Sequence, residues 1–103
     1  MVNFNGIDWR ILFVSPNHPE LRKKDNTYTL GACVKDNTTI YISNKLNKKK
    51  LKRVLYHEFA HAAMFSYNVY MTLEEEEYFA NLISLYGYEI ISKANNFFSQ
   101  LYK

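Results

Sequence analysis

Tyr56-His57-Glu58-Phe59-Ala60-His61-Ala62 is the stretch on which the expected fold depends. It contains the pattern H-E-x-x-H, and residues four apart on an α-helix lie one turn above each other on the same face. Two imidazoles placed in this way can bind one metal ion. Glu58 stands beside them, where it can take a proton from a metal-bound water. The pattern therefore predicts a helix through these residues and a zinc site on one face of it.

The sequence around the motif supports a helix from about Lys48 to Ser66. His57 and His61 continue the line of Val54, so the imidazoles are expected to face inward or into a cleft. Asn44 or Asn47 is the expected N-cap. The apolar stripe of this helix is formed by residues at helical spacing, namely Leu51, Val54, Leu55, Ala62 and Phe65.

The segments before the motif predict strands. Residues 9–15 are rich in aromatic and β-branched side chains and end at Pro16, which indicates a buried strand. Residues 29–35 and 39–43 flank the turn signal Asp36-Asn37 and predict a β-hairpin.

The segment after the motif predicts a last long helix. Thr72 is the expected cap, with Glu75 as its partner three residues later. Gly87 interrupts the apolar stripe of this helix and is expected to bend it. The expected fold is thus α+β, with a small, mainly antiparallel three-stranded sheet packed on the motif helix and on the long C-terminal helix.

Composition limits the class of protein. A chain of 103 residues with 48% hydrophobic residues predicts a single globular domain over residues 1–103. The single Cys33 cannot form an internal disulfide, and there is no signal peptide or membrane span, so a cytoplasmic protein without a membrane partner is expected. The net charge of +3 does not by itself argue for nucleic acid.

A third metal ligand must come from outside the motif, because a catalytic zinc has three protein ligands and a water. Four consecutive acids open the last helix, Glu74 to Glu77. Glu76 extends the inward stripe of that helix and is the predicted ligand, with Glu75 as the alternative; Glu74 and Glu77 are expected to point more outward. The alternative is that these acids bind no metal and only stabilise the N-terminus of the helix through its dipole.

Other residues have two interpretations. His18 lies in a loop, where a solvated side chain is the simpler interpretation, and Cys33 is expected to be a small buried hydrophobe rather than a ligand. A basic cluster at the start of the motif helix is either a solvated face or a contact for an acidic partner or nucleic acid; it comprises Lys45, Lys48, Lys49, Lys50, Lys52 and Arg53.

Two stretches of the chain resemble the ImmA/IrrE family of metallopeptidases, and more closely its small, phage-encoded members. They are Leu55-Tyr56-His57-Glu58-Phe59-Ala60-His61-Ala62 and Glu75-Glu76-Glu77-Tyr78-Phe79-Ala80-Asn81-Leu82-Ile83. In that family an H-E-x-x-H helix is followed by a second helix that carries a glutamate ligand. The segments Gly31-Ala32-Cys33 and Thr39-Ile40-Tyr41-Ile42-Ser43 are similar to the family's strand pair before the metal helix, and the resemblance covers most of the chain from Trp9 to Ile90.

The resemblance implies a zincin-like, zinc-dependent endopeptidase with His57, His61 and Glu76 or Glu75 as ligands and Glu58 as general base. It also implies a protein or peptide substrate, with a transcriptional repressor as the family's theme. Tyr67, Tyr70 and His18 are the candidate donors to the reaction's oxyanion. A protein-interaction module that the metal only stabilises is the alternative function, and a nucleic-acid binder that uses the basic cluster is a weaker one.

Overall fold

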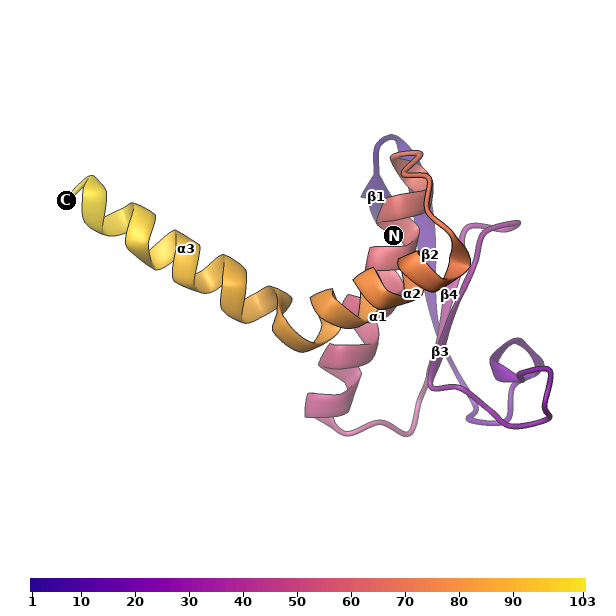
Figure 1. The fold of residues 1–103 in the computed structure, drawn as a ribbon. Coiled ribbons are helices and arrows are strands. Elements are labelled where there is room, and N and C mark those ends of the chain that lie inside the picture. Colours follow the sequence, from indigo (N-terminus) through magenta and orange to yellow (C-terminus); the bar gives the residue numbers. More distant parts are fainter.

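The computed structural model describes all 103 residues and has an α+β fold (Figure 1). Its sheet has four strands in the order β1-β2-β4-β3. In chain order the strands are β1 (Val2–Phe4), β2 (Ile7–Val14), β3 (Gly31–Val34) and β4 (Thr39–Ser43). The helical elements are η1 (Pro19–Leu21), α1 (Lys48–Ser66), α2 (Leu73–Leu82), the π-helical η2 (Ile83–Gly87) and α3 (Tyr88–Leu101).

The sheet corrects the expectation of three mainly antiparallel strands. β2 and β4 are parallel, while β1–β2 and β3–β4 are antiparallel. The expected hairpin of β3 and β4 is confirmed, but β3 pairs on the outer edge of β4, so β4 itself lies against β2. The added strand β1 turns into β2 through Asn5 and Gly6, which both have positive φ, as the type I′ turn of a two-residue hairpin requires.

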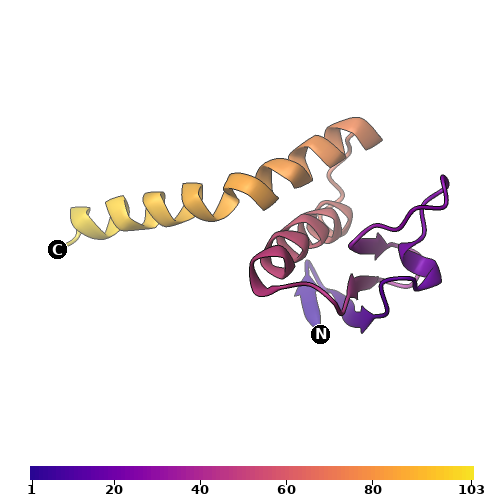
Figure 2. The same ribbon diagram turned by 90° about the horizontal axis from the view of Figure 1, so that it is seen from below.

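The motif helix α1 packs across one face of this sheet (Figure 2). Its bounds agree with the prediction, and the Asn47 side chain caps it by accepting from the Lys50 N–H at 2.8 Å. Trp9, Ile40 and Ala62 are completely buried between the sheet and the helix. The Trp9 indole also donates to the Ser66 hydroxyl at 2.9 Å. The core therefore fixes the helix that carries both histidines.

The last long helix is divided into three elements. Thr72 and Glu75 form the predicted capping box at the start of α2. Ala80 of α2 packs against Ala60 and Met64 of α1, and the Ser84 hydroxyl of η2 donates to the Arg53 carbonyl at 2.9 Å. α3 then leaves the body of the protein (Figure 1), which corrects the expectation that the whole C-terminal helix packs on the sheet. The structure contains no helix with the length and apolar character needed to cross a membrane.

Gly31 allows the edge strand β3 to approach α1 closely. A Cβ atom at this position would lie 2.7 Å from Val54 Cγ1 and 3.0 Å from Glu58 Cγ. Gly31→Ala is therefore expected to lower the free energy of unfolding by about 1–3 kcal/mol, the usual effect of overpacking. Chemical denaturation of the purified variant measures this loss.

A double-mutant cycle with Val54→Ala tests the cause. Removing the nearest contact makes room for the new methyl group, so the two losses in unfolding free energy should be less than additive. Additive losses would show that Gly31 is needed for another reason.

Candidate metal centre

His57 and His61 lie one turn apart on the same face of α1, as the motif predicts. Their ring centroids are 4.9 Å apart, and their Nε2 atoms are 3.2 Å apart. Both side chains are largely covered, because α2 crosses α1 at this level. The geometry of α1 thus brings two nitrogen donor atoms close together.

Glu77 of α2 brings a carboxylate to this point. Its Oε1 is 2.8 Å from His57 Nε2, and its Oε2 is 3.2 Å from His61 Nε2. One ligand atom from each of these three residues lies within 4.8 Å of the others. The structure therefore places Glu77, rather than the expected Glu76 or Glu75, with the two imidazoles. The Glu77 side chain remains 55% exposed, as its outward phase on α2 predicts.

Glu76 does face inward, but it contacts the opposite side of the His61 ring. Its Oε1 lies 2.7 Å from His61 Nδ1 and 3.5 Å from Lys35 Nζ. Burial acts to raise the pKa of Glu76, but the hydrogen bond with His61 and the charge of Lys35 outweigh it, so the pKa is lowered. An ionised Glu76 accepts the Nδ1–H of His61 and leaves the Nε2 lone pair free for a metal.

Glu75 has a different role in the structure. Its carboxylate accepts from the Thr72 N–H at 3.0 Å, while its own N–H donates to the Thr72 hydroxyl at 3.1 Å. These hydrogen bonds lower the pKa of Glu75. The alternative ligand is thus engaged at the helix cap and does not reach the histidines.

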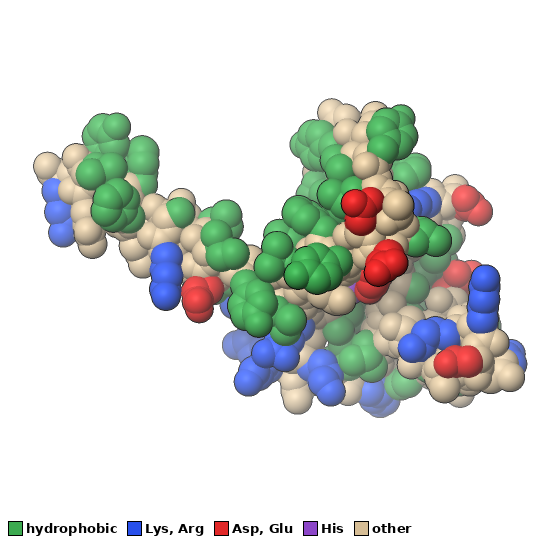
Figure 3. Space-filling view, viewed as in Figure 1, with side chains coloured by type: hydrophobic (Ala, Val, Ile, Leu, Met, Phe, Trp, Pro, Cys, Tyr) green, Lys and Arg blue, Asp and Glu red, His purple; other side chains and the backbone are tan.

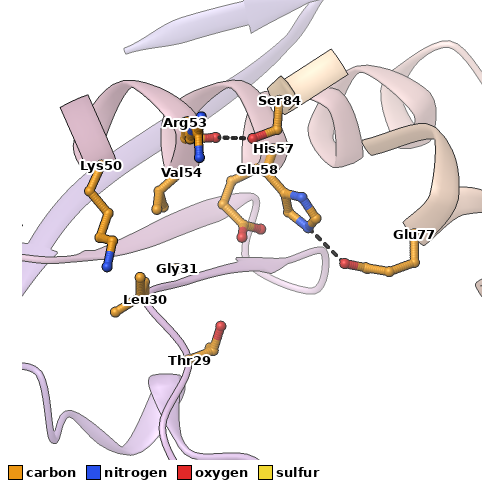
Figure 4. Close-up of a pocket in the computed structure, with 10 residues that line it drawn as sticks. All are labelled: Thr29, Leu30, Gly31, Lys50, Arg53, Val54, His57, Glu58, Glu77 and Ser84. Carbon is orange, nitrogen blue, oxygen red and sulfur yellow. Dashed lines mark hydrogen bonds and ion pairs between the residues drawn. The ribbon is translucent and has the colours of Figure 1, made fainter. Parts of the chain in front are cut away.

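Glu58 is 7% exposed and lies on the side of α1 that faces Gly31 (Figure 4). Burial raises the pKa of the Glu58 carboxyl from 4.5 to about 7; the nearby His61 opposes the rise and Glu77 adds to it. A carboxyl group with this pKa can both accept and release a proton near neutral pH.

His57 is held in the form that binds metals. Burial lowers the pKa of its imidazole, against the charge of Glu77. A metal ligand must be the neutral imidazole, so the surroundings of His57 favour binding before any ion is present.

The donor set fits zinc. Two imidazole nitrogens and one carboxylate form a known catalytic set, which leaves a fourth position for water. Ligand atoms about 2.0–2.1 Å from a tetrahedral ion are roughly 3.4 Å from each other. The Glu77 carboxylate already contacts one imidazole through each oxygen, at 2.8 and 3.2 Å, and the two imidazole nitrogens are 3.2 Å apart, so the three groups are close to the spacing that zinc needs.

A cleft of about 330 Å³ opens beside His57, Glu58 and Glu77 (Figure 4). The β3 segment forms one wall, and Lys50 and Arg53 of α1 extend the opposite wall. Neither of these cations forms a salt bridge, and the rest of the basic cluster is also without an acidic partner. The cleft therefore has a basic end at Lys50 and Arg53 and an acidic end at Glu58 and Glu77.

A line of polar residues along α2 and η2 could have revealed Glu77 in the sequence. Glu77, Asn81 and Ser84 are spaced i, i+4 and i+7, so they share one helix face next to the apolar stripe. Glu77 and Ser84 both line the cleft. A ligand that must leave one metal position open to solvent fits this border better than the buried stripe.

The remaining candidate residues lie away from the centre. His18 stacks on Tyr41 at 5.3 Å, and its Nδ1 accepts from the Glu20 N–H. Tyr67 and Tyr70 are exposed near the end of α1, and none of the three lines the cleft.

Cys33 packs against the core but is only half-buried, so it is less covered than the expected small buried hydrophobe. Burial raises the pKa of its thiol to about 12, and the nearby Glu58 adds to the rise. Cys33 is not part of the group that His57, His61 and Glu77 form.

Comparisons with models of protein families, with curated proteins and with solved structures found no match for this chain. The family resemblance rests on the residues of the motif and of the helix that follows it.

Proposed function

We propose that this protein is a zinc-dependent endopeptidase of the ImmA/IrrE type with a zincin-like arrangement of its helices. The observation that carries the proposal is the meeting of the Glu77 carboxylate with Nε2 of both His57 and His61, beside the buried Glu58. His57, His61 and Glu77 hold the ion, and Glu76 orients His61. We also propose that the protein acts in the cytoplasm and that its substrate is a regulatory protein, such as a repressor.

Each side chain has a distinct role in the proposed hydrolysis. Zinc, when bound, lowers the pKa of a coordinated water toward about 7 and polarises the scissile carbonyl. Glu58 takes the proton of the attacking water and returns it to the leaving amine. Its burial supports this role, because a carboxyl group with a raised pKa shares a proton readily near pH 7.

The free edge of β3 supports binding of an extended peptide. β3 pairs with β4 on one side only, and Gly31 and the residues before it line the cleft. A peptide that adds to this edge by main-chain hydrogen bonds passes directly beside His57 and Glu58.

The basic end of the cleft favours a peptide with an acidic side chain at that end. Lys50 and Arg53 are exposed, unpaired and one turn or less apart on the cleft wall. The positive end of the α1 dipole lies at the same end of the cleft and adds to their field. We therefore place an Asp or Glu side chain of the substrate against these two cations.

Metal removal tests the proposed function. A library of peptides derived from a digested proteome is incubated with the zinc-loaded protein, and new termini are identified by mass spectrometry. New termini are expected with zinc, should vanish after treatment with 1,10-phenanthroline, and should return when zinc is restored. Asp and Glu should be enriched within a few residues of the cuts. Stable complexes with intact peptides and no fragments would instead support the interaction module.

The charge preference has its own matched control. Reversing both cations with Lys50→Glu and Arg53→Glu is expected to reduce cleavage of acidic peptides about tenfold, since each reversed pair changes binding modestly at an exposed site. Lys23→Glu with Lys24→Glu makes the same change in net charge outside the cleft and should leave the preference intact.

A further inference from the structure

Apart from Tyr88 at its start, which lies under Lys52 of α1, the C-terminal helix α3 packs on no other part of its own chain. None of its residues is buried, and it projects from the body of the protein in both ribbon views (Figures 1 and 2). The radius of gyration is 15.3 Å, whereas a compact chain of this length has about 13 Å. α3 continues the helix of α2 and η2, but its large apolar side chains stay exposed to solvent.

One side of α3 is apolar and suited to packing against another surface. Its large apolar side chains lie within one broad stripe, while the other side carries serine, asparagine and glutamine. The space-filling view shows these apolar side chains gathered along the projecting helix (Figure 3). The stripe consists of Ile90, Ile91, Ala94, Phe97, Phe98 and Leu101, of which every large side chain is at least 55% exposed.

The centre of the stripe follows a heptad spacing. Within α3 the residues recur at intervals of four, three and four, in the order Ile90, Ala94, Phe97 and Leu101. The small Ala94 stands between the large Ile90 and Phe97. When two such helices run antiparallel, the small Ala94 at the centre of the stripe lets the backbones approach closely.

Charge favours a second copy over other occupants. α3 carries only Glu89 and Lys93 as charged residues, and these form an ion pair one turn apart. Two copies can therefore pair without repulsion between like charges. A helix that lies on a lipid surface has a row of lysines or arginines on its polar face, and α3 lacks such a row.

The area is also sufficient for a dimer. The exposed apolar side chains of α3 offer on the order of 600 Å² of surface per chain, since an aromatic side chain alone buries about 150–250 Å² when covered. Two chains would then bury roughly 1,200 Å², the lower limit for a stable interface. An antiparallel pair also keeps the two bodies, and their clefts, at opposite ends of the joined helices.

We infer that the protein forms a symmetric dimer in which α3 pairs antiparallel with α3 of a second copy through the stripe centred on Ile90, Ala94 and Phe97. The inference is independent of the metal centre. It predicts a mass twice that of the 12.2 kDa chain.

Light scattering after gel filtration tests the association. The wild-type chain at about 100 μM should have the mass of a dimer, and Ile90→Glu with Phe97→Glu should have the mass of a monomer. Asn96→Glu with Gln100→Glu adds the same charge on the polar side of the same helix and should remain dimeric. A monomeric wild type, or a dimer of the Ile90→Glu, Phe97→Glu variant, would overturn the inference, as would a monomer that binds phosphatidylcholine–phosphatidylserine vesicles.

A distance measurement tests the direction of pairing. A nitroxide label on Gln100→Cys, in a Cys33→Ser background, lies about 9 Å along the helix from its centre. Antiparallel pairing places the two labels more than about 20 Å apart, whereas parallel pairing brings them closer than that. A short distance between the labels would overturn the antiparallel arrangement.

Discussion

Glu58→Gln is expected to abolish hydrolysis and, at the same time, to stabilise the metal-free protein above pH 7. The loss of activity follows from the proposed role of Glu58, because removal of a general base reduces the rate typically 10²- to 10⁴-fold. Zinc binding should persist, since Glu58 is not among the three groups that meet at the centre. The cleavage assay and metal analysis of the purified variant measure these two effects.

The gain in stability follows from the pKa of the buried carboxyl group. Folding raises the pKa of Glu58 from 4.5 to about 7, so the folded state holds this proton more tightly than the unfolded state. The resulting stabilisation is complete below pH 4.5 and is lost as the pH rises through 7. By pH 8 the free energy of unfolding has lost about 3 kcal/mol of this contribution, since each unit of pKa difference corresponds to about 1.4 kcal/mol.

Glutamine has the same shape and carries no charge at any pH, so it avoids this loss. The melting temperature of Glu58→Gln relative to the wild type should therefore rise between pH 5 and pH 8, by at least about 5 °C. The lowered pKa of His57 is common to both proteins and cancels in the comparison. Glu74→Gln, at an exposed carboxylate without an ion pair, is the matched control and should show no such trend. Equal melting temperatures of Glu58→Gln and wild type at pH 8 would contradict the argument.

The sequence was sufficient to predict α1 and its two histidines because the deciding interactions are local. Apolar spacing, the Asn47 cap and the i, i+4 geometry all lie within one helix, and its bounds agree with the prediction. The capping box of Thr72 and Glu75 was predictable for the same reason.

The identity of the third candidate ligand depends on tertiary packing, so it could not be predicted from the sequence in the same way. Helical phase correctly placed Glu76 on the buried side of α2. Which glutamate meets both Nε2 atoms depends on how α2 crosses α1, and that crossing is set by Ala80 against Ala60 and Met64. It leaves Glu76 against Nδ1 of His61 and brings Glu77 to the cleft side.

The parallel pairing of β2 and β4 also could not be predicted from the sequence pattern. The β3–β4 hairpin can dock on β2 through either edge, and the alternation of side chains is the same in both cases. β1 has only three residues, which is too few to show a period, although the Asn5-Gly6 turn was a usable signal.

Glu77→Ala is expected to remove zinc from the protein while leaving the fold intact. The Glu77 side chain is 55% exposed, so its truncation opens no buried cavity, but it deletes the carboxylate that meets both imidazoles. Metal analysis after dialysis should give about one zinc per wild-type chain and almost none for Glu77→Ala, as for His57→Ala. Circular dichroism should show the same helix content in the variant as in the wild-type protein.

The two neighbouring glutamates provide graded controls for this result. Glu76→Gln can still accept the His61 Nδ1–H but loses its charge, so zinc affinity should fall about 10- to 100-fold, the usual effect of a group that orients a ligand. Glu75→Ala should bind zinc as tightly as the wild type, since it affects only the helix cap. Retention of zinc by Glu77→Ala together with its complete loss in Glu76→Ala would return the ligand role to Glu76. That result would mean that α2 rotates toward α1 when the metal binds, because Oε1 of Glu76 now contacts Nδ1 rather than Nε2 of His61.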